Sequence, residues 1–63
     1  MNIGDEIKKR RQGLRLTQQA LADMSGISVR RIKSIESNDA NPSLATIEKL
    51  LQPLGLQLEV TEA

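Results

Sequence analysis

Apolar positions recur along this chain with the three- and four-residue spacing of amphipathic helices. Ile3 and Ile7 stand four residues apart, which predicts a first helix from Asn2 or Ile3 to Gly13. Thr17 is a good N-cap for a second helix. The inner face predicted for this second helix consists of Ala20, Leu21 and Met24. The N-terminal third of the chain is therefore expected to be helical.

A tight turn around residues 25–27 follows, because Gly26 can take the positive φ that ends a helix. Ser28 caps a third predicted helix. This helix should end near Ser37 and Asn38, since asparagine tolerates the left-handed conformation. Two short helices joined in this way form a helix-turn-helix, whose second helix can lie in a DNA major groove.

A predicted loop over residues 39–42 precedes Ser43, which caps a fourth helix. Its apolar positions keep the i, i+3, i+4, i+7 spacing of one helix face, and they are Leu44, Ile47, Leu50, Leu51 and Leu54. Pro53 lacks an amide donor and Gly55 follows it, so we expect the fourth helix to stop there. The predicted fold is mainly α, with four to five helices.

Residues 56–61 alternate apolar and polar side chains, which is typical of a strand. A lone strand leaves its backbone groups unpaired, so the same segment of a second subunit could pair with it across a two-fold axis. Leu56, Leu58 and Val60 would then cover the helices of both subunits. The alternative is a frayed tail with accidental alternation. We thus divide the chain into a helix-turn-helix domain, 1–55, and a strand or dimerisation tail, 56–63.

The 63 residues make one domain, shorter than the ~70–80 residues at which a single core is comfortably stable. The sequence contains no Cys for a disulfide and no His for a zinc site, so a second copy is the expected source of extra stability. It lacks an apolar run of about 18 residues and a basic signal-peptide start. We therefore expect a cytoplasmic, nucleoid-associated homodimer with no membrane segment and no cofactor.

Charge is distributed unevenly along the chain. The net charge is +1, but residues 1–37 carry +4 and residues 38–63 carry −3. The basic part could face a polyanion while the acidic part meets another partner; chance scatter is the alternative. An enzyme is not expected, because His, Cys, a catalytic carboxylate pair and a glycine-rich phosphate loop are all missing.

The third predicted helix has two distinct faces when its residues are placed at 100° intervals. Ile32 and Ile35 point into the core, whereas the opposite face carries the candidates for reading base edges: Val29, Arg30, Lys33 and Ser34. An arginine can hold guanine O6 and N7 with two hydrogen bonds, and a valine can pack on a thymine methyl group. The alternative is an ordinary solvated helix face.

The chain resembles the Cro/C1-type (XRE) helix-turn-helix family, with phage repressors among its members. The matching segments are Leu16-Thr17-Gln18, Leu21-Ala22, Gly26-Ile27-Ser28, Ile32, Ile35-Glu36 and Asn41-Pro42-Ser43-Leu44. This resemblance implies a compact lambda-repressor-like domain. The tail, residues 54–60, is similar to that of HipB-type antitoxins, which implies strand pairing in a dimer and a HipA-like kinase-fold toxin as a possible partner.

The resemblance also assigns roles to individual residues. Gln18 matches the family position where the N-terminus of the second helix meets a phosphate. Weaker candidates for contact with the DNA backbone or the groove are Ser28, Gln19, Arg31 and Asn38. Arg11 and Glu36 match a partly buried ion pair that ties the first helix to the end of the third, so we interpret Arg11 as structural.

Three positions depart from the family pattern. Arg15 stands where glycine is usual, which implies strain if this position is left-handed. Ser37-Asn38 replaces Asn-Gly, and Arg10 replaces an apolar residue of the first helix. The function expected from the whole sequence is that of a homodimeric repressor of a palindromic operator, with an antitoxin role implied by the tail. The alternatives are a stand-alone phage-type or host regulator and a mainly protein-binding module of the same fold.

Overall fold

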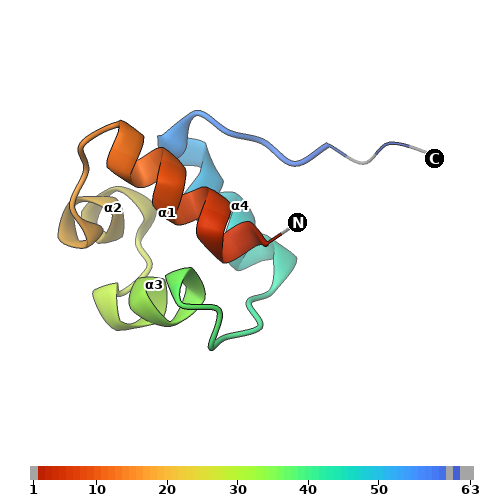
Figure 1. Cartoon of the computed structure of the whole chain (residues 1–63), viewed down its shortest axis with the longest axis horizontal. Helices are drawn as coiled ribbons and strands as arrows, with labels where there is room; N and C mark the ends of the chain where they lie inside the picture. Colours follow the sequence, from red (N-terminus) through yellow and green to blue (C-terminus); the bar gives the residue numbers. More distant parts are fainter. Residues whose placement is uncertain (1, 60, 62–63) are drawn as a thin grey trace.

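The computed structural model describes residues 2–59 and residue 61. Four α-helices, α1 (Ile3–Gly13), α2 (Gln18–Ser25), α3 (Val29–Glu36) and α4 (Leu44–Leu51), are followed by a 3₁₀ helix, η1 (Gln52–Leu54). The helices surround one core, and the C-terminal tail extends away from them (Figure 1). The four predicted helices and their order are confirmed.

Three hydroxyl side chains begin the three shorter α-helices. The hydroxyl oxygens of Thr17, Ser28 and Ser43 accept hydrogen bonds from backbone N–H groups three residues later, at distances of 2.9 to 3.2 Å. Each bond satisfies an amide that has no partner inside its helix, and such a cap contributes about 1 kcal/mol. All three predicted caps are confirmed.

The core is formed by apolar side chains from all five elements. Its buried members are Ile7, Leu21, Ala22, Ile32, Ile35, Leu50, Leu51 and Leu54. Two predicted inward positions are wrong. Met24, near the end of α2, is 55% exposed, and Leu44, the first residue of α4, is 61% exposed. Ala22 occupies the inward position of α2 that Met24 was expected to share with Leu21.

Left-handed residues end or follow each helical segment. Gly26 has a φ of 76° and Gly55 a φ of 71°, and two residues with side chains, Arg15 at 59° and Asn38 at 63°, share this conformation. The left-handed conformation expected of Gly26 and Asn38 is confirmed. A side chain with a Cβ costs about 1–2 kcal/mol there, although asparagine tolerates it better than most residues. Arg15 is therefore the strained position of the four.

We expect Arg15→Gly to leave the melting temperature unchanged or to raise it, since glycine removes the left-handed strain of about 1 kcal/mol. The Arg15 side chain is exposed, so the substitution removes little packing. Thermal unfolding followed by circular dichroism measures this effect. A fall of several degrees would contradict this explanation of the turn.

Arg10 has a definite structural place, although apolar residues are usual at its position. Its Nε donates a 2.9 Å hydrogen bond to the carbonyl oxygen of Leu54, at the end of η1. The backbone N–H of Leu56 in turn donates to the carbonyl oxygen of Leu51 at 3.0 Å. These two bonds fix the point at which the tail leaves the helices, next to α1.

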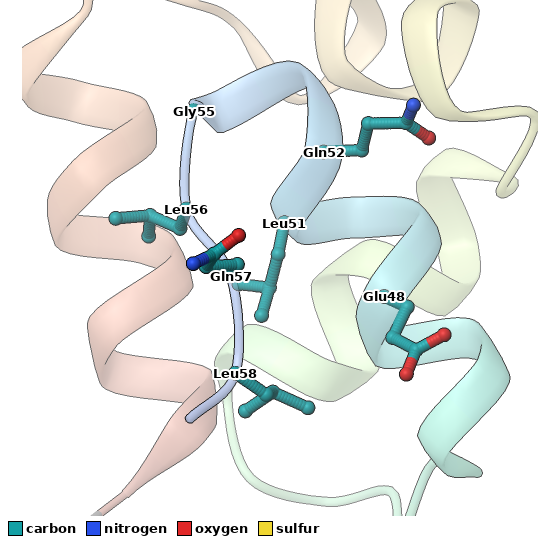
Figure 2. Close-up of a pocket in the computed structure, with 7 residues that line it drawn as sticks. All are labelled: Glu48, Leu51, Gln52, Gly55, Leu56, Gln57 and Leu58. Carbon is teal, nitrogen blue, oxygen red and sulfur yellow. The ribbon is translucent and has the colours of Figure 1, made fainter. Parts of the chain in front are cut away.

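The predicted C-terminal strand is not present in the part of the tail that the structure describes. Residues 56–59 and 61 have no strand assignment, and Val60 lies outside the described residues. In Figure 2, Leu56 points toward α1, whereas Leu58 points toward the side of α4. Side chains two residues apart in a strand would share a face, so the described part of the tail lacks strand geometry. A strand has no hydrogen-bonding neighbour within one chain, which explains the difference.

Candidate nucleic-acid interface

The helix-turn-helix is built from α2, the turn at residues 26–28, and α3. The backbone N–H of Gly26 donates to the carbonyl oxygen of Ala22 at 2.9 Å, and the Ser25 hydroxyl accepts from the Ile27 N–H at 3.1 Å. These bonds keep the turn short. Leu21 of α2 and Ile32 of α3 are both completely buried, so the two helices share one core and form a single unit.

One side of α3 is buried and the other is exposed. The buried side consists of Ile32, Ile35 and Glu36. The exposed side carries three cations, Arg30, Arg31 and Lys33, and no acidic residue. Because the apolar side is fixed to the core, the cationic side is held outward along the length of the helix. This arrangement presents positive charge and hydrogen-bond donors on a rod of the size that a DNA major groove admits.

Two of the predicted readout residues lie deeper than the cations. Ser34 is half-buried, and Val29 is half-buried and packs against the core. Ser28, Arg30, Arg31 and Ser34 line a hollow of about 330 Å³, together with Ala40 from the loop before α4. Ala40 is not predicted from the sequence, since nothing in a single alanine within a loop signals contact with a neighbouring helix.

Arg11 and Glu36 form the ion pair expected from the family resemblance. Arg11 Nε and Nη2 donate to the two carboxylate oxygens of Glu36 at 2.7 and 2.9 Å, and Nη1 donates to the Leu16 carbonyl oxygen at 2.7 Å. Both residues are more than nine-tenths buried. The hydrogen bond to Glu36 holds the pKa of Arg11 above its ordinary value, although burial alone would lower it. This pair ties α1 to the end of α3.

Gln18 belongs to the same hydrogen-bonded group. Its Nε2 donates to Glu36 Oε1 at 3.2 Å, and the residue is half-buried at the N-terminus of α2. Its side chain therefore joins α2 to the ion pair in the free protein. The family resemblance implies a phosphate contact for Gln18 and does not predict its bond to Glu36, because several partners lie within reach of a long amide side chain.

The two remaining candidates also have partners within the chain. Gln19 Nε2 donates to Asp23 Oδ1 at 3.0 Å on the exposed side of α2. Asn38 Nδ2 donates to Asp5 Oδ1 at 3.2 Å, so this side chain is directed to α1. The structure thus brings Ser28, Arg30, Arg31 and Ser34 together around one hollow. Asn38 lies just beyond the C-terminal end of α3, next to α1.

The part of the chain that the structure describes offers no group of three or more metal-binding side chains. Within the same residues, no helix is long and apolar enough to cross a membrane.

Comparison with known proteins places the chain in a family. A family model described as "Helix-turn-helix" matches residues 7–60. The chain is 38% identical over 58 residues to an immunity repressor protein of Bacillus phage phi105 and 40% identical over 55 residues to an HTH-type transcriptional regulator of Haemophilus influenzae. It is 34% identical over 55 residues to the HTH-type transcriptional regulator PuuR of Escherichia coli.

These matches cover most of this chain but only part of each relative. They include 92%, 87% and 87% of this chain, and 40%, 56% and 30% of the three relatives in the same order. The chain therefore spans between 30% and 56% of the length of these relatives. No solved structure shows a significant match. The three relatives are named as transcriptional regulators or as a repressor. On the family model and these relatives, the chain belongs to the Cro/C1-type (XRE) helix-turn-helix family.

Proposed function

We propose that this chain is a sequence-specific DNA-binding module of a transcriptional repressor, with α3 as its recognition helix. The observation that carries the proposal is the outward cationic face of α3, opposite its buried residues Ile32, Ile35 and Glu36. The regulators among its relatives support the same assignment. On this proposal, the protein acts in the cytoplasm, on the nucleoid.

The proposed contacts divide into two groups. Arg30 and Lys33 read base edges, with Val29 and Ser34 beside them at the surface of the groove. Contacts with the DNA backbone come from Gln18, Gln19, Ser28, Arg31 and Asn38. For Gln18, contact with a phosphate competes with its 3.2 Å bond to Glu36, so this contact requires the side chain to turn outward or to use its second N–H. Phosphate contacts predict that affinity falls steeply with salt concentration.

We further propose that the repressor is a homodimer on a palindromic operator. Two recognition helices in successive major grooves lie about 34–36 Å apart or at a multiple of that distance. One eight-residue helix offers too few contacts for specific binding by itself. The C-terminal tails, with Leu56, Leu58 and Val60, are the proposed dimerisation element, since the large apolar side chains of Leu56 and Leu58 are exposed and a second copy could cover them.

Arg30→Ala is expected to weaken operator binding by ~1–3 kcal/mol and to relax the preference at one base position. The operator is first selected from random duplex DNA, and affinity is then measured by fluorescence anisotropy at fixed salt. Lys49→Ala is the matched control, because it removes one exposed cation from α4 and should leave affinity nearly unchanged. Equal losses for both variants would contradict the assignment of α3 as the reading helix.

A second role rests on the tail and on the acidic C-terminal part of the chain. Similarity of residues 54–60 to HipB-type antitoxins, with exposed Glu48 and Glu59, favours an additional protein partner such as a HipA-like kinase-fold toxin. An antitoxin can also repress its own operon, so the two roles are compatible. Co-purification with the product of an adjacent gene tests this role. A stand-alone regulator is indicated if no neighbouring gene product binds.

A further inference from the structure

Arg15 is a strained residue in the loop that joins α1 to α2. This loop lies on the side of the molecule away from the C-terminal tail (Figure 1). The φ of Arg15 is 59°, a left-handed conformation that glycine takes without strain and that a residue with a Cβ does not. Because residues held in such conformations cluster at functional sites, an outlier of this kind leads to a hypothesis of function.

The Arg15 side chain does not hold the fold together. It is exposed, so it adds little to packing. Among residues 2–59 and 61, the arginine side chains that bond to the rest of the protein are those of Arg10 and Arg11, whereas Arg15 forms neither a hydrogen bond nor an ion pair. The strain is therefore not offset by a contact within the described chain, and the positive charge is available to a partner outside it.

The backbone on both sides of this charge is fixed. The N–H of Arg15 donates to the Gln12 carbonyl oxygen at 2.9 Å, and the N–H of Leu16 donates to the Arg11 carbonyl oxygen at 3.0 Å. The Leu16 carbonyl oxygen accepts from Arg11 Nη1 at 2.7 Å. The Arg15 side chain thus starts from a rigid turn, which lowers the entropy that is lost when it binds a ligand.

One group of hydrogen bonds connects this turn to the proposed DNA-binding surface. The Arg11 side chain holds both Leu16 and Glu36, the last residue of α3. Gln18, the first residue of α2, donates to the same Glu36 carboxylate. Arg15 and Gln18 are three residues apart, so their Cα atoms are separated by at most about 11 Å. The exposed cation therefore lies next to the proposed phosphate contact of Gln18.

We propose that Arg15 binds a DNA phosphate next to the one that Gln18 contacts. This inference rests on the proposed DNA-binding function and adds to it a contact at a position where the family pattern has glycine. A phosphate contact carries no sequence information, so Arg15 raises the affinity for every duplex and does not select bases. The strain in the free protein is offset in the complex by a charge-assisted hydrogen bond to the phosphate.

Three substitutions separate the charge of Arg15 from its backbone conformation. Arg15→Lys keeps the charge and the strain, Arg15→Asn removes the charge and tolerates the left-handed conformation, and Arg15→Gly removes both charge and strain. On the selected operator, measured by fluorescence anisotropy in about 0.1 M salt, Arg15→Asn and Arg15→Gly should bind roughly fivefold more weakly for each protomer engaged. Arg15→Lys should retain most of the affinity, since lysine also binds phosphate. Lys49→Ala, which removes an exposed cation from α4, should leave affinity nearly unchanged.

The salt dependence of binding gives a readout that a structural defect would not change. Each phosphate contact adds about 0.9 to the steepness of log affinity against log salt concentration. Between about 50 and 200 mM salt, Arg15→Asn and Arg15→Gly should therefore lose about this much steepness per protomer. The same relative loss should appear on operator duplexes with one base pair exchanged. Melting temperatures at or above that of the wild type would show that weaker binding does not come from unfolding.

The results separate this inference from the proposed function. Unchanged affinity and salt dependence in Arg15→Asn, together with weaker and less selective binding by Arg30→Ala, would overturn the Arg15 contact and leave α3 as the reading helix. A loss in Arg15→Gly without one in Arg15→Asn would assign the effect to the backbone and also overturn the contact. A wild-type chain that selects no duplex from random DNA would overturn the proposed function and this inference with it. A shallower salt dependence in Arg15→Asn and Arg15→Gly, but not in Arg15→Lys, supports the proposal.

Discussion

Arg11→Ala is expected to lower the free energy of unfolding by about 3–5 kcal/mol, because it leaves the buried carboxylate of Glu36 without its cation. Gln18 would remain as one neutral donor to this carboxylate. A domain of this size has a total stability of only ~3–9 kcal/mol. The substitution should therefore remove a large share of the total stability, as urea titration followed by circular dichroism would measure.

Two controls distinguish the buried pair from general effects of charge. Lys8→Ala removes a neighbouring cation of α1 from an exposed position and should change stability by less than about 0.5 kcal/mol. Replacing both partners, as Arg11→Met with Glu36→Leu, should cost less than Arg11→Ala alone, since no charge stays buried. An Arg11→Ala protein as stable as Lys8→Ala would show that the pair contributes little.

Gly4→Ala is expected to cost about 3 kcal/mol of stability, because α1 passes directly over the end of α3 at this residue. A Cβ on Gly4 would overlap the carbonyl oxygen of Ile35 and Oδ1 of Asn38. Ile35 is buried and its carbonyl belongs to the backbone of α3, so the clash cannot be relieved by a side-chain rotation. Overpacking of this kind typically costs 1–3 kcal/mol.

Gly13→Ala is the matched control in the same helix. A Cβ at Gly13 would meet no atom within 4 Å, and alanine is the better helix former by up to about 1 kcal/mol. We expect the melting temperature of Gly13→Ala to stay level or rise, while that of Gly4→Ala falls by ten degrees or more. Similar melting temperatures for the two variants would refute the close approach of α1 and α3.

Local chemistry allowed most of the helical framework to be predicted from the sequence. The caps at Thr17, Ser28 and Ser43 and the left-handed Gly26 depend on interactions within three or four residues, which the sequence displays directly. The two faces of α3 were also predictable, because isoleucines and cations alternate there with helical spacing. These features needed no knowledge of how the helices pack.

The features that the sequence did not predict depend on packing between segments. Met24 and Leu44 satisfy the apolar spacing of their helices, yet a helix of eight residues is too short for spacing alone to say which end reaches the core. The bonds from Arg10 to Leu54 and from Gln18 to Glu36 join residues 44 and 18 positions apart. Long side chains of this kind select their partners only after the helices have assembled.

The two ends of α1 have different neighbours. Near its start, Gly4 and Asp5 contact the end of α3, and Arg10 near its other end contacts Leu54, where the tail begins. If the tails form the dimer, the length of α1 sets the distance between the symmetry axis and the DNA-reading surface. One residue inserted in its middle would turn these ends by about 100° and separate them by a further 1.5 Å. The operator spacing that such a dimer accepts would then be determined by α1, a helix that itself reads no base.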